Sequence, residues 1–392
     1  MDKVRLGTVM TLHRGYDLPN AQRKSGDVPV ISSSGISGSH SIAKLDGENV
    51  ITGRYGTIGE VFYHNGPCWP LNTTLFVEDF HGNDPKYVAY LLEVMLNALQ
   101  IDGTDKSTVP GVDRNVLHDL VVPYISDLVS QKTTTRVLSA IDAKIANNKK
   151  LMAELEKTAR LIYDYWFTQF DFPDENGWPY RSSGGKMAWS DELKREIPEG
   201  WKASSLSELC GFRNGVNYDK DSMSGSHCRI VNVRNITSST LFINPSELDE
   251  IDLPANLVKR YSLGSNDILI ARSGTPGAVR LIDEPTGIIF CGFIICCTPN
   301  NSEYRSYLTM ALKRLEGTTA TVTGGSILKN VSQDTLKSVK VVCPPKEVIE
   351  RFNAMIDVML RQIVRIEKES WNLINLRDWL LPMLMNGQLV VD

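Results

Sequence analysis

The chain repeats itself, and this duplication constrains the fold more than any other feature of its 392 residues. Leu6 and Gly15 recur 200 positions later as Leu206 and Gly215. The string GRYGTIGEV (53–61) recurs 218 positions later as ARSGTPGAV (271–279), so the second copy carries an insertion of about 18 residues around 241–264. Five later matches keep a spacing of 219, joining Ser107, Val112, Leu117, Leu120 and Val122 to Ser326, Val331, Leu336, Val339 and Val341. The chain is therefore expected to be a duplicated unit.

Each copy begins with short apolar and β-branched runs separated by glycine, proline, asparagine and serine, which predicts strands and turns. CGFIICC (291–297) is expected to be one such buried strand. A helical apolar pattern follows in both copies, at 84–99 and 302–315. The fold class predicted is α+β, with two mixed, β-rich domains related by a pseudo-two-fold repeat.

Each copy ends in a long helical pattern. No glycine or proline occurs between Leu128 and Phe170, and apolar residues there recur in steps of three and four. Asn148 is the one polar position of this first stripe. The second stripe runs from Phe352 to Leu384. We expect the two helices to pair as an antiparallel coiled coil that separates the two domains; the alternative is that each helix folds back on its own domain.

The patterns predict five segments. They are a domain at 1–125, a long helix at 126–170, a connector rich in proline, glycine and serine at 171–200, a second domain at 201–345, and a second long helix with a C-terminal tail at 346–392.

Composition and motifs exclude several functions. The net charge of −4 counts mildly against DNA binding, although only local patches matter for phosphate contacts. The absence of an 18-residue apolar run argues against a membrane span, and the mixed N-terminus does not predict a signal peptide. Seven scattered cysteines without a CxxC pair indicate a reducing cytoplasm and no metal site. GxxxxGK[ST] and HExxH do not occur, and GRYGTIGEV continues into a strand-like run, so its glycines are expected to turn a hairpin with positive φ angles rather than hold a phosphate.

The order of these segments resembles the specificity (S) subunits of Type I restriction–modification systems. The resemblance rests on YWFTQFDFP (165–173), IPEGW (197–201), LRDWLLPMLMNGQL (376–389) and the glycine loops NVITGRYGTIG and DILIARSGTPG. It implies a non-catalytic subunit whose two target-recognition domains each bind one half of a bipartite, asymmetric double-stranded DNA site. It also implies helices that set the spacer between the halves and dock two methyltransferase (M) subunits.

The resemblance further implies that cofactors belong to the partners. The M subunits would bind S-adenosylmethionine and methylate adenine N6, and restriction (R) subunits, using ATP and Mg²⁺, would complete the nuclease. Two unequal fused domains also suit a site that is not palindromic.

Candidate DNA-binding residues are the polar residues of the predicted loops, since Arg, Asn and Gln read bases while Lys, Ser and Thr mostly contact phosphates. In the first domain they are Arg14, Ser33, Ser34, Arg54, Tyr55, Thr57, Lys106 and Ser107. In the second they are Arg213, Asn217, Tyr218, Arg234, Asn235, Arg272, Ser273, Thr275, Thr323 and Lys329. Arg54 and Arg272 rank first because each ends a predicted strand. Any one of the others could instead be an ordinary solvated loop residue.

Five aromatic residues of the long helices are candidates for the partner surface: Tyr163, Tyr165, Trp166, Trp371 and Trp379. Two other classes of function remain open. The acidic net charge and long helices would also suit a protein-interaction scaffold that does not bind DNA, and catalytic residues that meet only in space would make the chain a solitary enzyme.

Overall fold

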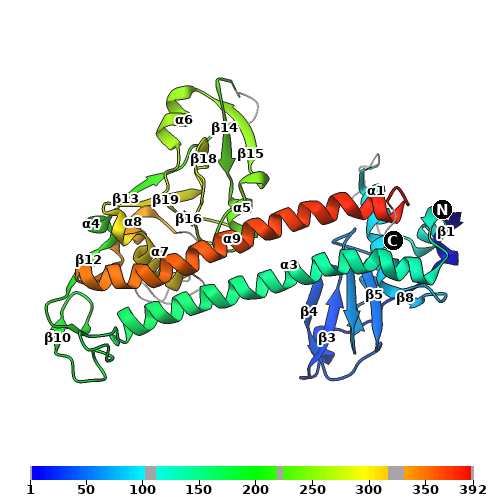
Figure 1. The fold of residues 1–392 in the computed structure, drawn as a ribbon, viewed down its shortest axis with the longest axis horizontal. Helices are drawn as coiled ribbons and strands as arrows, with labels where there is room; N and C mark the ends of the chain where they lie inside the picture. The colour runs from blue at the N-terminus through cyan, green and yellow to red at the C-terminus, as the bar shows by residue number, and fades with distance from the viewer. Residues whose placement is uncertain (1, 102–111, 219–223, 317–330, 390–392) are drawn as a thin grey trace. The chain divides into compact units, whose positions relative to one another are not determined.

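The computed structural model describes residues 2–101, 112–218, 224–316 and 331–389. It divides into two compact units, which we describe separately. Unit 1 contains residues 1–146 and 372–392, and unit 2 contains residues 147–371. Each unit holds one β-rich head together with segments of both long helices (Figure 1).

The first head, residues 1–125, contains three small sheets, with strand orders β2-β8-β5-β6, β4-β3-β7 and β1-β9. Its strands are β1 (Asp2–Arg5), β2 (Thr11–Arg14), β3 (Val28–Ser32), β4 (Gly35–His40), β5 (Glu48–Gly53), β6 (Val61–Asn65), β7 (Trp69–Pro70), β8 (Thr74–Asp79) and β9 (Val121–Tyr124). Its helices are α1 (Pro85–Ile101) and α2 (Arg114–Asp119). Buried residues of α1 such as Tyr87 and Leu91 pack on this head's core.

The second head, residues 201–345, repeats this topology, with strand orders β13-β19-β16-β17, β15-β14-β18 and β12-β20. Its strands are β12 (Lys202–Ser205), β13 (Cys210–Asn214), β14 (Ser226–Val231), β15 (Asp249–Leu253), β16 (Ile268–Ala271), β17 (Val279–Arg280), β18 (Ile288–Phe290), β19 (Ile294–Pro299) and β20 (Lys340–Cys343). Its helices are α4 (Leu206–Leu209), α5 (Val233–Ser238), α6 (Ala255–Tyr261), α7 (Arg305–Leu315) and α8 (Gln333–Ser338). CGFIICC is not a single strand: Cys291–Phe293 form the turn between β18 and β19.

Corresponding backbone hydrogen bonds confirm the duplication at the atomic level. The amide of Leu6 donates to the Leu120 carbonyl at 2.8 Å, and that of Leu206 donates to the Val339 carbonyl at 2.8 Å. Likewise, the Gly15 amide bonds to Thr74 and the Gly215 amide to Ile294, at 3.0 and 3.2 Å. Because these bonds involve only main-chain atoms, the two heads keep one scaffold while their side chains differ.

The long helices are α3 (Leu128–Tyr163), extended by a π-helical turn at Asp164–Thr168, and α9 (Lys346–Met385). In unit 2 they run antiparallel: Asn148 of α3 donates to Ser370 of α9 at 3.1 Å, while Trp166 packs on Phe352 with ring centroids 5.8 Å apart. In unit 1, Leu138 of α3 shares a core with Leu384 of α9. The predicted antiparallel pairing is confirmed, and Asn148 is the buried polar position of its seam.

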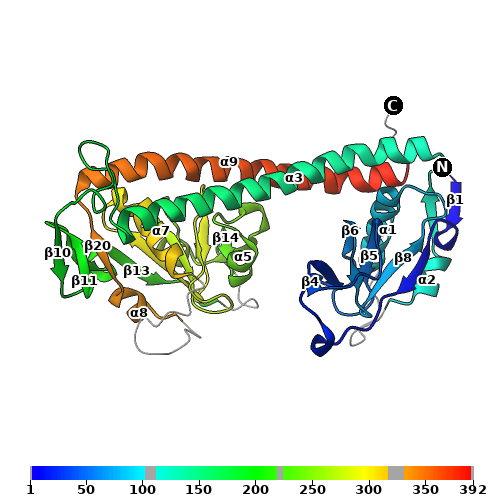
Figure 2. The same cartoon turned by 90° about the horizontal axis from the view of Figure 1, so that it is seen from below.

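The long helices also pack on the heads, so they both pair with each other, as predicted, and contact the domains, as the alternative had it. In unit 2, helix α7 lies against the helix pair (Figure 2), and its Tyr307 meets Tyr163 of α3 at a centroid distance of 5.6 Å.

The connector contributes to the core of unit 2, which the sequence did not predict. Strands β10 (Met187–Ser190) and β11 (Arg195–Pro198) form a hairpin. Phe172 is buried and stacks on Trp201 with centroids 4.9 Å apart, and Ile197 is buried in the same cluster.

Candidate nucleic-acid interface

Arg54 and Arg272 occupy equivalent positions, each directly after an internal strand of its sheet. The Arg54 amide donates to the Thr73 carbonyl at 2.8 Å, and its own carbonyl accepts from the Val112 amide at 2.9 Å. In the second head the Arg272 amide donates to Phe293 at 3.0 Å, and its carbonyl accepts from Val331 at 3.2 Å. Both arginines are therefore fixed at the main chain, and only their side chains are adjustable.

The glycine loops are hairpin turns, as predicted, and no helix follows them. Strand β5 pairs antiparallel with β6, and β16 with β17. The predicted positive φ angles are found, including 86° at Gly56 and 77° at Gly274. A Cβ atom at Gly53 would lie 1.9 Å from the Thr57 carbonyl oxygen, so the turn also requires close backbone contact.

In the first head the candidates surround an open cavity of about 610 Å³ lined by Arg14, Arg54, Tyr55 and Arg114, among others. The Arg54 guanidinium lies over the exposed Tyr55 ring, 4.6 Å from its centroid. Arg14 is exposed, and its one ion pair with a described residue is a long contact with Asp17, at 4.0 Å. This cavity combines cationic side chains with one aromatic ring, which suits a polyanion with flat bases.

The smaller candidates of the first head lie near the same turn. Thr57 is exposed within it, and Ser33 is half-buried against Gly53 and Gly56. Ser34 is exposed and its hydroxyl bonds to Ser32 at 3.2 Å.

In the second head, Arg272 donates from Nη1 to the Gly292 carbonyl at 3.1 Å, which anchors part of its guanidinium. Ser273 and Thr275 follow it in the turn, and the Thr275 hydroxyl lies 3.4 Å from that of Thr237. Asn217 is exposed and lies against Gly292, while the half-buried Tyr218 donates to Asn232 at 3.3 Å. Asn217 is thus close to Arg272, and Tyr218 mainly supports the fold.

Two candidate DNA-binding residues have side chains that are bonded within the head. Arg213 donates to the Asp267 carboxylate at 2.6 Å and to the carbonyls of Arg260 and Ser262, so its guanidinium is committed within the head. Asn235 is buried, accepts from the Asn232 amide at 2.8 Å and donates to the Glu247 carbonyl at 3.1 Å. Both side chains hold loops together.

Arg234 remains exposed, although it pairs with Asp249. Four other candidates, Lys106, Ser107, Thr323 and Lys329, lie outside the described residues.

The structure adds four residues to the candidate DNA-binding residues: Arg114, Asn214, Phe293 and Gln333. Asn214 ends β13 as Arg14 ends β2, and Gln333 begins α8 as Arg114 begins α2. The Gln333 side-chain amide donates to Asn214 Oδ1 at 2.9 Å. Phe293, 62% exposed, lies in the turn that receives the Arg272 amide. The repeat spacings of 200 and 219 pair Arg14 with Asn214 and Arg114 with Gln333, so the sequence could have indicated these positions.

The predicted partner surface is also corrected. Tyr163 and Trp166 are buried in the core of unit 2, where they pack on Phe352, so neither is a surface residue. Tyr165 is 39% exposed and Trp379 is 57% exposed, and Trp371 is half-buried. These three remain candidates for contact with another chain.

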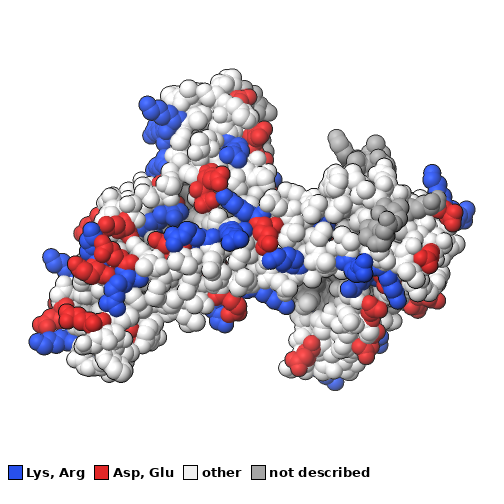
Figure 3. Space-filling model, in the orientation of Figure 1, with Lys and Arg blue, Asp and Glu red and all other residues white. Residues whose placement is uncertain are grey.

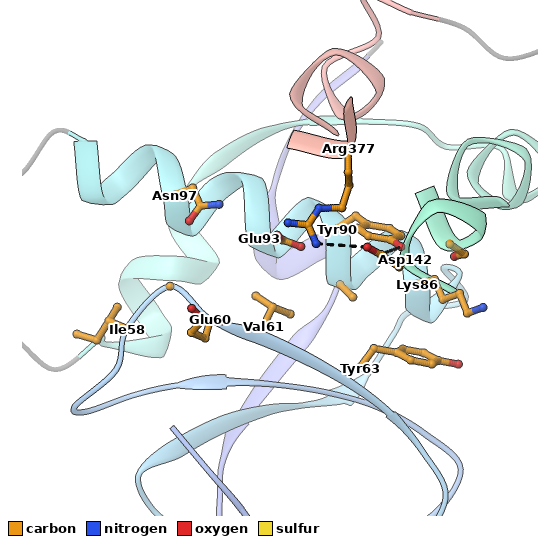
Figure 4. A pocket seen from close by; sticks show the side chains of 13 residues that line it. Ile58, Glu60, Val61, Tyr63, Lys86, Tyr90, Glu93, Asn97, Asp142 and Arg377 are labelled. Atoms are coloured by element: carbon orange, nitrogen blue, oxygen red, sulfur yellow. Dashed lines mark hydrogen bonds and ion pairs between the residues drawn. The ribbon is translucent and has the colours of Figure 1, made fainter. Parts of the chain in front are cut away.

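A second cavity, of about 570 Å³, lies in unit 1 between the β5–β6 hairpin, α1 and the long helices (Figure 4). Tyr90 donates to Asp142 at 2.5 Å, and Arg377 pairs with the same carboxylate at 3.3 Å. Burial raises the pKa of Glu93, which faces Arg377. The contacts of Asp142 with Tyr90 and Arg377 therefore connect α1 to both long helices within unit 1.

Both signs of charge are mixed on one face of the described surface. On the face seen in Figure 3, acidic and basic side chains are interspersed, and the described residues there show no broad area of one sign. Among the described residues no His, Cys, Asp and Glu cluster could hold a metal ion, and no described helix is long and apolar enough to span a bilayer.

Comparison with known proteins identifies the class. The family "Type I restriction modification DNA specificity domain" matches residues 1–157 and 198–375, and the chain belongs to this family. The chain is 24% identical over 316 residues to the Type I restriction enzyme MjaIX specificity subunit of Methanocaldococcus jannaschii, covering 78% of this chain and 69% of that protein. It is 20% identical over 316 residues to the HindI specificity subunit of Haemophilus influenzae, covering 68% of each.

A solved structure shows the same fold. The S subunit of a Type I restriction–modification system from M. genitalium superposes with a TM-score of 0.58 at 17% identity, covering 98% of this chain and 96% of that one. The predicted class, a non-catalytic specificity subunit, is therefore confirmed.

Proposed function

We propose that the chain gives a Type I restriction–modification complex its DNA sequence specificity, with each head binding one half of a bipartite, asymmetric site. The observation that carries this proposal is the repeated arginine turn. Arg54 and Arg272 are held by equivalent main-chain hydrogen bonds in two heads of one topology, yet different side chains surround them. Two related but unequal readers on one chain suit a site with two unequal halves.

In this proposal the long helices set the gap between the half-sites and dock two methyltransferase subunits, with Tyr165, Trp371 and Trp379 as candidate contacts. The methyltransferase subunits bind S-adenosylmethionine and methylate adenine N6. Nuclease subunits that use ATP and Mg²⁺ complete the restriction enzyme. The chain itself needs no cofactor for recognition.

The test is co-expression with the cognate methyltransferase subunits in a host without adenine methylation, followed by single-molecule sequencing of its DNA. We expect one bipartite N6-methyladenine motif. Arg272→Ala should relax or weaken recognition in one half only, with the complex still assembled. A host genome without any bipartite motif would refute the proposal. Sequence-selective DNA binding by the chain without the methyltransferase subunits would exclude the alternative, a scaffold that does not bind DNA.

A further inference from the structure

We propose that the two heads read chemically different bases through two equivalent positions. Arg14 and Arg114 select guanine in the first head, and their counterparts Asn214 and Gln333 select adenine in the second. This inference rests on the proposed function. Arg14 and Asn214 each end the strand that pairs with β8 or β19. Arg114 and Gln333 each directly follow the residue that caps a short helix, Asp113 or Ser332.

The two positions are close to the arginine turn in both heads. The carbonyl of Arg54 accepts from Val112, two residues before Arg114, and the carbonyl of Arg272 accepts from Val331, two residues before Gln333. In the first head, Arg14, Arg54 and Arg114 line one cavity. The paired positions in the two heads therefore correspond in their structural surroundings as well as in their sequence spacing.

The first head presents donors and little competing acceptor charge. Arg114 is exposed and makes no ion pair with any described residue, and Arg14 has only its long contact to Asp17. Asp113, the acidic neighbour, already accepts from the Asn115 amide at 2.8 Å. Guanine offers two acceptors, N7 and O6, on its major-groove edge, and a guanidinium donates to both. An arginine-lined cavity therefore fits guanine better than adenine.

The second head replaces these donors by a pair of amides. With Gln333 Nε2 donating to Asn214 Oδ1 at 2.9 Å, Asn214 Nδ2 and Gln333 Oε1 have no partner among the described residues. The unpartnered NH2 group of Asn214 and the unpartnered carbonyl oxygen of Gln333 match adenine, which accepts at N7 and donates from N6. A guanine would place O6 against the Gln333 oxygen, which is an acceptor facing an acceptor.

The experiment uses the complex with its methyltransferase subunits and duplexes in which each base pair of the wild-type motif is replaced in turn. Gln333→Ala should lose discrimination at one A·T pair of one half-site by about tenfold, the scale of a bidentate base contact. Gln333→Glu should move the preference there toward a pair containing cytosine, because a carboxylate accepts from cytosine N4. Arg114→Gln should relax one G·C pair in the other half-site. Arg181→Gln, an exposed arginine of the connector, is the matched control.

Several outcomes would overturn the inference. If Gln333→Ala relaxes a G·C pair, or weakens binding to all sequences equally, the amides do not read adenine. If Arg114→Gln lowers affinity uniformly and reduces the salt dependence of binding, Arg114 contacts a phosphate. Thermal melting of each variant identifies misfolding. If Gln333→Ala misfolds, Gln333→Glu tests the adenine contact instead, since it keeps the size of the side chain. Failure of the proposed function is separate, because the wild-type complex would then yield no bipartite motif.

Discussion

Replacing Glu367 by glutamine should stabilise unit 2 more at alkaline pH than at acid pH. Glu367 of α9 is 4% exposed, and its Oε1 accepts from the Thr240 hydroxyl. Its Oε2 is buried and has no hydrogen-bond partner among the described residues. Burial raises the pKa of this carboxyl from its ordinary 4.5 to about 7, with the Glu156 carboxylate of α3 adding to the effect and Thr240 and Arg280 opposing it.

The magnitude follows from proton linkage. Since the folded-state pKa exceeds the unfolded one, the folded protein holds this proton more tightly, and stability falls as pH rises from 4.5 through about 7. The gap between these values corresponds to roughly 3 kcal/mol, at about 1.4 kcal/mol for each tenfold change in proton affinity. Glutamine resembles the protonated acid, can still accept from Thr240, and never ionises.

The assay is urea unfolding at pH 5.0 and pH 8.5, followed by the fluorescence of the buried Trp166 and Trp201. Glu367→Gln should exceed the wild type by about 1 kcal/mol at pH 5.0, where most of the unfolded carboxyl is already ionised, and by about 3 kcal/mol at pH 8.5. Glu350→Gln, an exposed position on the same helix, should give no such pH-dependent difference. A stability difference that is equal at both pH values, or larger at pH 5.0, would refute the reasoning.

Two further predictions concern the scaffold of the second head. Lys313 is 3% exposed and pairs with Glu316 at 2.6 Å and with Glu156 at 3.1 Å. Lys313→Met should cost about 1.5–3 kcal/mol in urea unfolding, because two charged contacts are lost while Arg280 and Arg160 stay paired with these carboxylates; a cost below 1 kcal/mol would contradict this. A Cβ atom at Gly215 would lie 2.2 Å from the Cys291 carbonyl oxygen, so Gly215→Ala should abolish recognition of one half-site in the methylation assay. Gly211→Ala, where the nearest atom is 3.9 Å away, should not.

The fold was predictable because its signals are local or periodic. The repeat spacing gave two heads of one topology, and the heptad stripe gave two paired helices with Asn148 in their seam. The hairpin at Gly56 followed from the strand pattern beside it. Trp166 continues the heptad stripe and lies in the core, so its candidacy for the partner surface was wrong whereas its place in the stripe was right.

The candidate site was less predictable because its polar residues compete for partners that are distant in the chain. Arg213 and Arg272 look alike in sequence, as arginines near strand ends. Only the fold shows that Asp267, 54 positions away, binds Arg213, whereas Arg272 keeps part of its guanidinium available. Gln333, by contrast, was not predicted, because nothing in the neighbouring sequence distinguishes it and its hydrogen bond to Asn214 spans 119 positions.

Under the proposed function, the division of work between backbone and side chains lets one scaffold serve two different readers. The contacts that hold each arginine turn, such as Val112 to Arg54 and Val331 to Arg272, join main-chain atoms. A substitution at a reading position therefore changes the groups presented to a base while the turn keeps its place. Where a side chain does support the scaffold, as Asn235 does, it is buried and not free to vary with the sequence that is read. Variation in specificity should thus concentrate at positions such as the exposed Arg114 and the half-buried Gln333.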